Sequence, residues 1–305
     1  MAAFTAKDVA ALREKTGCGM MDCKKALTDA EGNMEKAIDL LREKGLAAAT
    51  KKAGRIAAEG VAFACTNDDN TAGVVIEVNA ETDFVAKNAE FQNFVKICAD
   101  TVMQENPADL DALLACKAAG TDMTVEALVQ DKVLTIGENI KIRRFVRYEG
   151  VVATYIHGGG RIGVLVKFET TPEIAAKEEF KAYAKDICMQ VAAANPGYLN
   201  EASVPADVIE HERKILTEQV IIVSKAPKIA EKIVNGKMGK YYKENCLVDQ
   251  LFVKDGDYTV AKYTDKIGKD LGGKIEIVSF VRYEKGEGLE KKSDNFADEV
   301  ASMIK

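Results

Sequence analysis

The chain contains an internal repeat, and this repeat constrains the fold more than any other feature of the sequence. When the sequence is shifted by 90 residues, Glu-Gly-Val at 59–61 falls on 149–151, and Ile-Cys at 97–98 falls on 187–188. Each copy is predicted to run strand, turn, strand, helix, and both helices carry apolar residues at helical spacing. These residues are Phe91, Phe94, Val95 and Cys98 in the first copy, and Phe180, Tyr183, Ala184 and Ile187 in the second. The sequence therefore predicts a duplicated α+β core with antiparallel sheets.

About 45 extra residues are predicted inside the second copy. The sequence Phe-Val-Arg-Tyr-Glu closes the first copy at 145–149 and recurs at 280–284, a shift of 135 residues. Residues 205–224 have the spacing of one amphipathic helix, and Pro227 opens a second that continues towards Asn235. We therefore expect an inserted helical hairpin over about 198–242. Its apolar positions are expected to form the seam between its own helices, although a solitary hairpin could offer some of them to a partner.

The first 46 residues are predicted to form a three-helix domain. Thr5 and Asp8 have the spacing of a capping box that opens the first helix. A second helix is expected over 20–30 and a third over 34–44, which would end at Gly45. The expected division of the chain is the three-helix domain at 1–46, a connector at 47–59, core repeat 1 at 60–149, core repeat 2 with its hairpin at 150–288, and a C-terminal module at 289–305. The C-terminal module is expected to be a short helix with Phe296, Val300 and Met303 on one face.

Composition argues against several classes of function. The 42 lysine and arginine residues are outnumbered by 48 aspartate and glutamate residues, whereas phosphate binding depends on concentrated positive charge. We therefore expect no direct nucleic-acid partner. The two histidines, His157 and His211, are too few for a Ser/His/Asp or multi-histidine metal site, so we expect no catalytic residue, metal or cofactor.

The cysteines and the hydropathy pattern indicate a location. Seven cysteines without a Cys-x-x-Cys motif are typical of reduced thiols in a cytoplasmic protein. The sequence lacks an apolar run of ~18 residues, so no membrane span is expected, and its first residues do not have the layout of a secretory signal. The expected location is therefore the cytoplasm.

Residues 268–274 match the phosphate-loop pattern G-x-x-x-x-G-K. A working phosphate loop needs serine or threonine at the next position and a strand before its first glycine. Ile275 takes the next position, and residues 263–266 precede the motif in place of a strand. We therefore expect no nucleotide binding here. A phosphate-loop enzyme would differ by binding GDP or ATP as the isolated chain.

The most informative junction is 77–88 (EVNAETDFVAKN), where an apolar run ends and a helix begins around Phe84. The pattern leaves two interpretations open. Phe84 lies seven residues before Phe91, so one unbroken helix would place it in the core; alternatively, Phe84 inserts into a partner. At the shift of 90 residues, Pro-Glu-Ile at 172–174 falls on Thr-Asp-Phe at 82–84. The duplicated scaffold therefore does not itself require Asp-Phe there, although the helical spacing taken alone favours the core position.

A glycine-rich loop, His-Gly-Gly-Gly-Arg at 157–161, joins two predicted strands of the second copy. Glycine permits the positive φ angles of a hairpin turn, which accounts for the glycines themselves. His157 at the tip of this loop is a candidate for contact with a partner.

Two segments resemble the signatures of the elongation factor Ts family. Residues 12–27 (LREKTGCGMMDCKKAL) are similar to its N-terminal signature, and residues 77–87 (EVNAETDFVAK) to its second. Residues 136–140, 161–166 and 282–288 also resemble the family, so the similarity covers essentially the whole chain. The departures are Cys18 where alanine is usual, Ala80 where serine or cysteine is common, and one extra glycine after His157.

The resemblance implies a guanine-nucleotide exchange factor for elongation factor Tu in bacterial-type translation. It also implies an N-terminal three-helix (UBA-like) domain, a duplicated core, an inserted coiled-coil hairpin and a C-terminal helical module. Such a factor binds elongation factor Tu–GDP and promotes GDP release by disturbing the Mg²⁺ of its partner, which allows GTP to rebind. Both a one-to-one complex and a dimer of heterodimers are compatible with this role.

The resemblance also implies which residues act. Asp83 and Phe84 would carry the main role, with the aromatic ring inserted beside the nucleotide site of the partner. Thr82 and Val85 complete the Mg²⁺-displacing segment. Further partner contacts are expected from Arg13, Met20, Met21, Ile136 and Gly137, in addition to His157. A ribosome- or RNA-associated adaptor that uses the helical domain is the second interpretation, and the low basic content argues against it.

Overall fold

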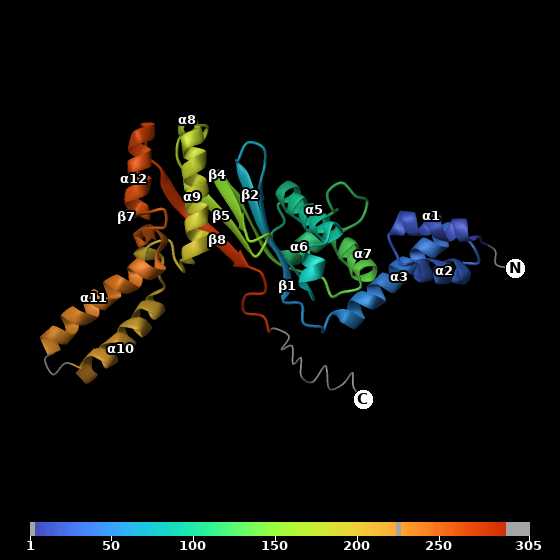
Figure 1. Cartoon of the computed structure of the whole chain (residues 1–305), viewed down its shortest axis with the longest axis horizontal. Helices are drawn as coiled ribbons and strands as arrows, with labels where there is room; N and C mark the ends of the chain where they lie inside the picture. Colours follow the sequence, from blue (N-terminus) through green and yellow to red (C-terminus); the bar gives the residue numbers. More distant parts are fainter. Residues whose placement is uncertain (1–3, 224–226, 291–305) are drawn as a thin grey trace.

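The structure is a computed structural model that describes residues 4–223 and 227–290. The molecule is elongated, with the N-terminal helices at one end, a helical hairpin at the other and two sheets between them (Figure 1). Helices are mixed with small antiparallel sheets, so the predicted α+β class is confirmed. Within the described residues, no helix is long and apolar enough to cross a membrane.

The first copy of the repeat forms a three-stranded antiparallel sheet in which β2 is central. The strands are β1 (Glu59–Thr66), β2 (Ala72–Ala80) and β3 (Lys141–Glu149). A short helix, α4 (Asp83–Ala86), follows β2 and leads into α5 (Ala89–Glu105). The predicted stripe of α5 is fully buried against this sheet and forms the first core with it. Helices α6 (Leu110–Ala115) and α7 (Val125–Ile136) then lead into β3.

The second copy repeats this order. Its sheet contains β4 (Val151–His157), β5 (Ile162–Glu169) and β8 (Glu276–Glu284), again antiparallel with the middle strand central. Helices α8 (Pro172–Ala175) and α9 (Glu178–Ala194) follow β5. Helix α12 (Val260–Leu271) precedes β8 as α7 precedes β3. The strand, strand, helix, strand order predicted for both copies is confirmed.

The residue equivalence between the copies changes along the chain. In the strands, Val75 and Leu165, which are 90 residues apart, both face the opposite sheet. The helices α5 and α9 instead end at Asn106 and Asn195, which are 89 residues apart and have φ angles of 46° and 44°. The second copy is therefore one residue shorter between strand and helix. The predicted equivalence of Phe84 with Ile174 is wrong by one residue, and Glu173 occupies the corresponding position.

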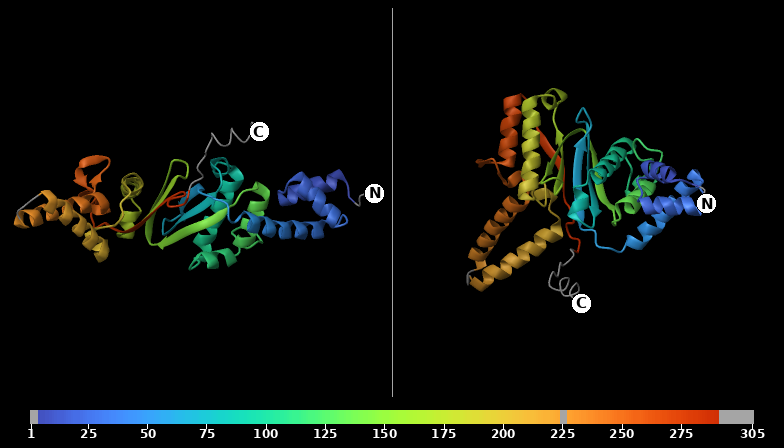
Figure 2. Two further views of the ribbon diagram at one scale, coloured as in Figure 1. Left: turned by 90° about the horizontal axis from the view of Figure 1, so that it is seen from below. Right: turned by 45° about the vertical axis from the view of Figure 1, so that its right-hand side comes forward.

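The two sheets pack face to face and share a separate core between them. Ala62, Ala64 and Val75 from the first sheet contact Val152 and Leu165 from the second. Neighbouring residues of β2, such as Val74, face α5. Both faces of β2 are therefore buried, which explains its continuous apolar run. In Figures 1 and 2 the sheets lie between α9 on one side and α5 on the other.

The glycine loop of the second copy takes part in this contact. The carbonyl of Gly160 accepts a hydrogen bond from the backbone N–H of Ala62 at 2.8 Å, and a Cβ on Gly160 would lie 2.6 Å from Cγ1 of Val61. The predicted hairpin is confirmed, because β4 and β5 pair on either side of the loop. However, Gly160 is required by the neighbouring sheet as well as by its own φ of 96°.

This contact predicts different outcomes for two neighbouring glycines. Gly159 has a φ of 64° and open space around it, so Gly159→Ala should cost only the left-handed conformation, about 1 kcal/mol. Gly160→Ala should cost a further ~1–3 kcal/mol, because its methyl group overlaps Val61. Urea unfolding of the two variants measures the difference. Equal losses would show that the close approach to β1 contributes nothing.

Three helices form the N-terminal unit around Leu12, Cys23 and Leu27. They are α1 (Ala6–Thr16), α2 (Met20–Asp29) and α3 (Met34–Lys52), and the capping box of Thr5 and Asp8 is present. The predicted end of the third helix at Lys44 is wrong, because α3 continues to Lys52. Residues 47–52, expected to belong to a connector, are therefore helical.

Gly45 has a different role from the one predicted. It lies inside α3, where a Cβ would be 3.4 Å from the carbonyl oxygen of Gln130 in α7. A glycine at this point permits the close approach of the two helices, and residues 46–49 (Leu-Ala-Ala-Ala) are strong helix formers. The glycine therefore marks a helix contact and not a helix end.

The insertion of the second copy is a helical hairpin, as predicted. Helix α10 (Ala206–Val223) and helix α11 (Pro227–Asn245) lie side by side (Figure 1). Helix α11 runs ten residues beyond the predicted Asn235. The predicted seam is confirmed, because the two helices bury their own apolar residues between them. These residues include Leu216, Val220, Val234 and Met238.

The remaining elements join the hairpin to the core of the second copy. Strands β6 (Leu251–Phe252) and β7 (Asp255–Thr259) pair before α12. The G-x-x-x-x-G-K sequence begins inside α12 at Gly268, and Gly272 ends that helix in the left-handed region, as Gly137 ends α7. The glycines of the motif therefore end a helix that the first copy also contains, and the motif does not form a strand–loop–helix phosphate site. The predicted tail helix, with Phe296, Val300 and Met303, lies outside the described residues.

Candidate functional site

Phe84 is exposed on a short helix. The side chain of Phe84 is 81% exposed, while Val85 is half-buried against the first core and Ala86 is buried. The core interpretation of Phe84 is therefore wrong. Its basis, an unbroken helix to Phe91, does not hold, because α4 ends before Asn88, whose side chain caps α5 by accepting the N–H of Glu90 at 2.7 Å.

The second copy shows what the scaffold places at this position. Glu173, which corresponds to Phe84 in the helix register, is also exposed. The position therefore faces solvent in both copies, with a carboxylate in one and an aromatic ring in the other. A phenylalanine here contributes little to burial, and large aromatic side chains are common anchors of protein interfaces.

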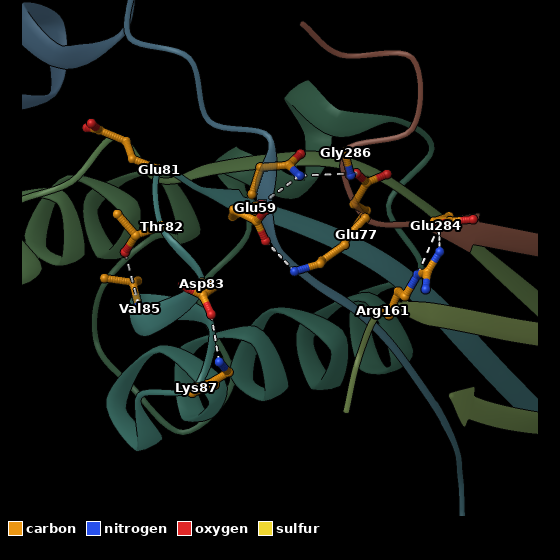
Figure 3. Close-up of polar contacts among 12 residues, drawn as sticks. Glu59, Glu77, Glu81, Thr82, Asp83, Val85, Lys87, Arg161, Glu284 and Gly286 are labelled. Carbon is orange, nitrogen blue, oxygen red and sulfur yellow. Dashed lines mark hydrogen bonds and ion pairs between the residues drawn. The ribbon is translucent and has the colours of Figure 1, made fainter. Parts of the chain in front are cut away.

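Asp83 and Thr82 shape the start of α4 (Figure 3). The hydroxyl of Thr82 accepts the backbone N–H of Val85 at 3.3 Å and so caps the helix. Asp83 accepts a hydrogen bond from Lys87 Nζ at 2.6 Å. This bond holds the pKa of the Asp83 carboxyl below its ordinary value, so Asp83 is ionised beside the exposed ring.

Two glutamates hold this helix against the end of α7, and the sequence interpretation missed both. The Glu138 carboxylate accepts the backbone N–H of Glu81 at 3.0 Å and that of Thr82 at 3.1 Å, and the Thr82 hydroxyl at 2.7 Å. In return, Glu81 accepts the backbone N–H of Asn139 at 2.7 Å. The only signal in the sequence was that both glutamates lie in segments that resemble family signatures.

The predicted contact residues of the N-terminal unit flank a loop that lies near the end of α7. Met20 and Met21 are 46% and 73% exposed, and Arg13 is exposed. A Cβ on Gly17 would lie 3.6 Å from Cγ2 of Thr135, so the loop before Met20 is adjacent to the last turn of α7.

Ile136 is the last residue of α7, and Gly137 follows it directly before Glu138. Ile136 is half-buried and packs against the first core, while Gly137 is exposed with a φ of 89°. The structure thus arranges these two residues, the α1–α2 loop and the Phe84 helix around one end of α7. Of the residues expected to contact a partner, His157 alone lies in the second copy, and it was expected from its place in the glycine loop.

His157 is exposed at the end of β4. Its Nδ1 lies 3.2 Å from the hydroxyl of Tyr155. Within the part of the chain that the structure describes, no hydrogen bond or ion pair connects His157 to residues 82–85. Its loop is linked to the start of β1 through Lys285, whose N–H donates to the carbonyl of Arg161 and whose side chain is paired with Glu59.

A buried carboxylate lies in β2, the strand that leads to the site. Glu77 is fully buried in β2 and accepts hydrogen bonds from Arg144 Nε at 2.6 Å, Arg143 Nη1 at 3.0 Å, Asn79 Nδ2 at 3.1 Å and the Gly286 N–H at 2.8 Å. Burial would raise the pKa of Glu77, but these hydrogen bonds hold the pKa below its ordinary value. The contact with Gly286 attaches the segment after β8 to the first copy (Figure 3).

The fold and the site together define a class of protein. It is a duplicated α+β protein that presents one large aromatic side chain on a short helix fixed by hydrogen bonds. Within residues 4–223 and 227–290, no three His, Cys, Asp or Glu side chains gather in a way that could hold a metal ion.

Comparison with known proteins identifies the family. The model of the family described as Elongation factor TS matches residues 81–287. Elongation factor Ts of Syntrophotalea carbinolica is 50% identical over 305 residues, which cover 99% of each chain. Elongation factor Ts of Clostridioides difficile is 48% identical over 307 residues, which cover 100% of each chain. The chain belongs to the elongation factor Ts family and is a translation elongation factor.

Proposed function

We propose that this protein is the guanine-nucleotide exchange factor of elongation factor Tu. It binds elongation factor Tu–GDP, inserts Phe84 beside the nucleotide site and disturbs the bound Mg²⁺, so that GDP leaves and GTP rebinds. The observation that carries this proposal is the exposure of Phe84, 81%, on a helix whose start is fixed by Thr82 and Glu138.

The mechanism is a coupling between two binding equilibria. If the protein binds the nucleotide-free partner more tightly than the GDP-bound partner, it must weaken GDP binding by the same factor. Mg²⁺ neutralises phosphate charge, so its displacement removes much of the attraction that holds GDP. The exchange involves no covalent step.

Each residue of the segment has a distinct part in this proposal. Phe84 supplies the apolar area that is buried in the partner. Asp83, kept ionised by Lys87, places a negative charge beside it. Thr82 caps the helix, and Val85 anchors it to the first core.

A second group of residues is proposed to supply affinity. Arg13, Met20 and Met21 would contact the partner from the N-terminal unit, with Ile136 and Gly137 beside them and His157 contributing from the second copy. The exposure of both methionines supports this assignment. We further propose a UBA-like class for residues 1–46, the domain division given above, action in the cytoplasm and no direct contact with nucleic acid.

The test is the release of labelled GDP from elongation factor Tu. The release rate should rise with the concentration of the full chain and reach a plateau. The isolated chain should not bind GDP or ATP in equilibrium dialysis, which separates an exchange factor from a nucleotide-binding enzyme. An unchanged release rate at saturating concentration would refute the proposal.

A further inference from the structure

We infer that Glu138 is a positioning residue for the exchange reaction: its carboxylate fixes the direction in which α4 presents Phe84. This inference rests on the proposed function. Glu138 does not need to touch the partner for this role, because it acts through Thr82 and the backbone of α4.

The need for such a residue follows from the length of α4. Four residues are too few to sustain a helix alone, since a helical turn is costly to nucleate. The orientation of α4 therefore depends on the groups at its two ends. At its start, the one carboxylate of Glu138 accepts three hydrogen bonds, from the N–H groups of Glu81 and Thr82 and from the Thr82 hydroxyl. Hydrogen bonds to an ionised acceptor are stronger than neutral ones.

The contact is reciprocal, which makes it rigid. Glu81 accepts the backbone N–H of Asn139, the residue after Glu138, at 2.7 Å. The side chain of Asn139 donates to the carbonyl of Arg55 at 2.8 Å, and Arg55 pairs with Glu81 at 3.4 Å. The segment after α3, the start of α4 and the end of α7 therefore meet through the two carboxylates.

The duplicated copy shows that the fold does not require this arrangement. Gly273 follows α12 at the position where Glu138 follows α7, since Gly137 and Gly272 both end their helices in the left-handed region. In the second copy a glycine takes the place of this carboxylate, and Ile174 packs so closely that a Cβ on Gly273 would lie 2.5 Å from its Cδ1. The polar contact there is a single hydroxyl bond, from Thr170 to the carbonyl of Lys274 at 2.9 Å, with Lys177 bonded to the carbonyl of Leu271. The carboxylate is present only in the copy that carries the exposed phenylalanine, which favours a functional role over a structural one.

A cycle of variants tests the inference. Glu138→Ala should lower the plateau rate of GDP release about tenfold, with a smaller change in the affinity for elongation factor Tu. The plateau rate of Glu138→Gln should lie between those of wild type and Glu138→Ala, because an amide retains one acceptor oxygen. In a Phe84→Ala background, adding Glu138→Ala should change the rate less than twofold. The matched control is Glu126→Ala, which removes an exposed carboxylate from the first turn of α7.

A measurement without the partner separates this inference from the proposed function. In the isolated full chain, Glu138→Ala should speed amide hydrogen exchange at residues 85–88 at least tenfold and leave α5 unchanged. If Glu138→Ala lowers GDP release equally with and without Phe84, the positioning role is wrong. A third outcome is faster amide hydrogen exchange at residues 85–88 in Glu138→Ala, together with a wild-type chain that does not accelerate GDP release from elongation factor Tu. In that case the proposed function fails and the positioning of α4 stands.

Discussion

Phe84→Ala is expected to remove most of the exchange activity and to leave the fold intact. Aromatic anchors at protein interfaces contribute roughly 2 kcal/mol or more, so the acceleration of GDP release should fall by about 30-fold. The free energy of unfolding should change by no more than ~0.5 kcal/mol, because substitutions at exposed positions have small effects and the ring of Phe84 is 81% exposed. The two measurements are GDP release at saturating chain concentration and urea unfolding of the free chain.

Two further variants sharpen this experiment. Phe84→Glu gives the first copy the residue type that the second copy carries at Glu173, so it should fold normally and be as inactive as Phe84→Ala. Leu46→Ala removes another exposed apolar side chain, 53% exposed on α3, and should retain normal exchange. Unfolding of Phe84→Ala, or a normal rate of GDP release by it, would contradict the insertion of this ring into the partner.

Glu77→Gln is expected to lower the free energy of unfolding by about 3 kcal/mol at neutral pH. Removing one member of a buried ion pair costs roughly 3–5 kcal/mol, and the low end applies because Arg143 and Arg144 are 24% and 30% exposed. Urea unfolding at pH 7 measures the loss. The matched control is Glu287→Gln, which removes the other carboxylate that pairs with Arg144. This carboxylate is 47% exposed, and its loss should cost less than ~1 kcal/mol. Equal losses would show that the burial of Glu77 is irrelevant.

The effect of Glu77 also depends on pH. Its pKa is lowered in the folded protein from an ordinary value of 4.5, so the unfolded chain binds the proton first as the pH falls. The stability that the carboxylate contributes is therefore complete well above pH 4.5 and is lost as the pH falls through the lowered pKa. The difference between wild type and Glu77→Gln should be constant from about pH 6 to 8 and should shrink below pH 4.5. A difference that grows in acid would contradict this account.

The repeat made most of the core predictable. Stripes such as Phe91 and Phe94 recur in both copies with helical spacing, and burial follows directly from such spacing. The hairpin was also predictable, because the matches at 145–149 and 280–284 fixed the size of the insert. These features depend on periodicity, which a sequence displays without any knowledge of contacts.

The details of the site depend on contacts that periodicity does not reveal. The hydrogen bonds of Glu138 join residues 56 and 57 positions apart. Neither Glu138 nor Glu81 belongs to a periodic hydrophobic pattern. The helix break at Asn88 turns Phe84 out of the core position that an unbroken helix would give it, and asparagine is a common helix cap. Gly45 was interpreted as a helix end because its close neighbour, Gln130, lies in a distant segment.

The continuation of α3 past Gly45 to Lys52, and its packing on α7, has a consequence for affinity. The α1–α2 loop and the Phe84 helix are joined through packed helices and not through a flexible tether. When one of two linked surfaces has bound, the effective concentration of the other depends on the stiffness and span of the link. A stiff link of the correct span avoids the entropy of ordering a tether, so two individually weak contacts can give avid binding to one partner. A partner in which the two matching surfaces are separated by another distance would gain nothing from the second contact.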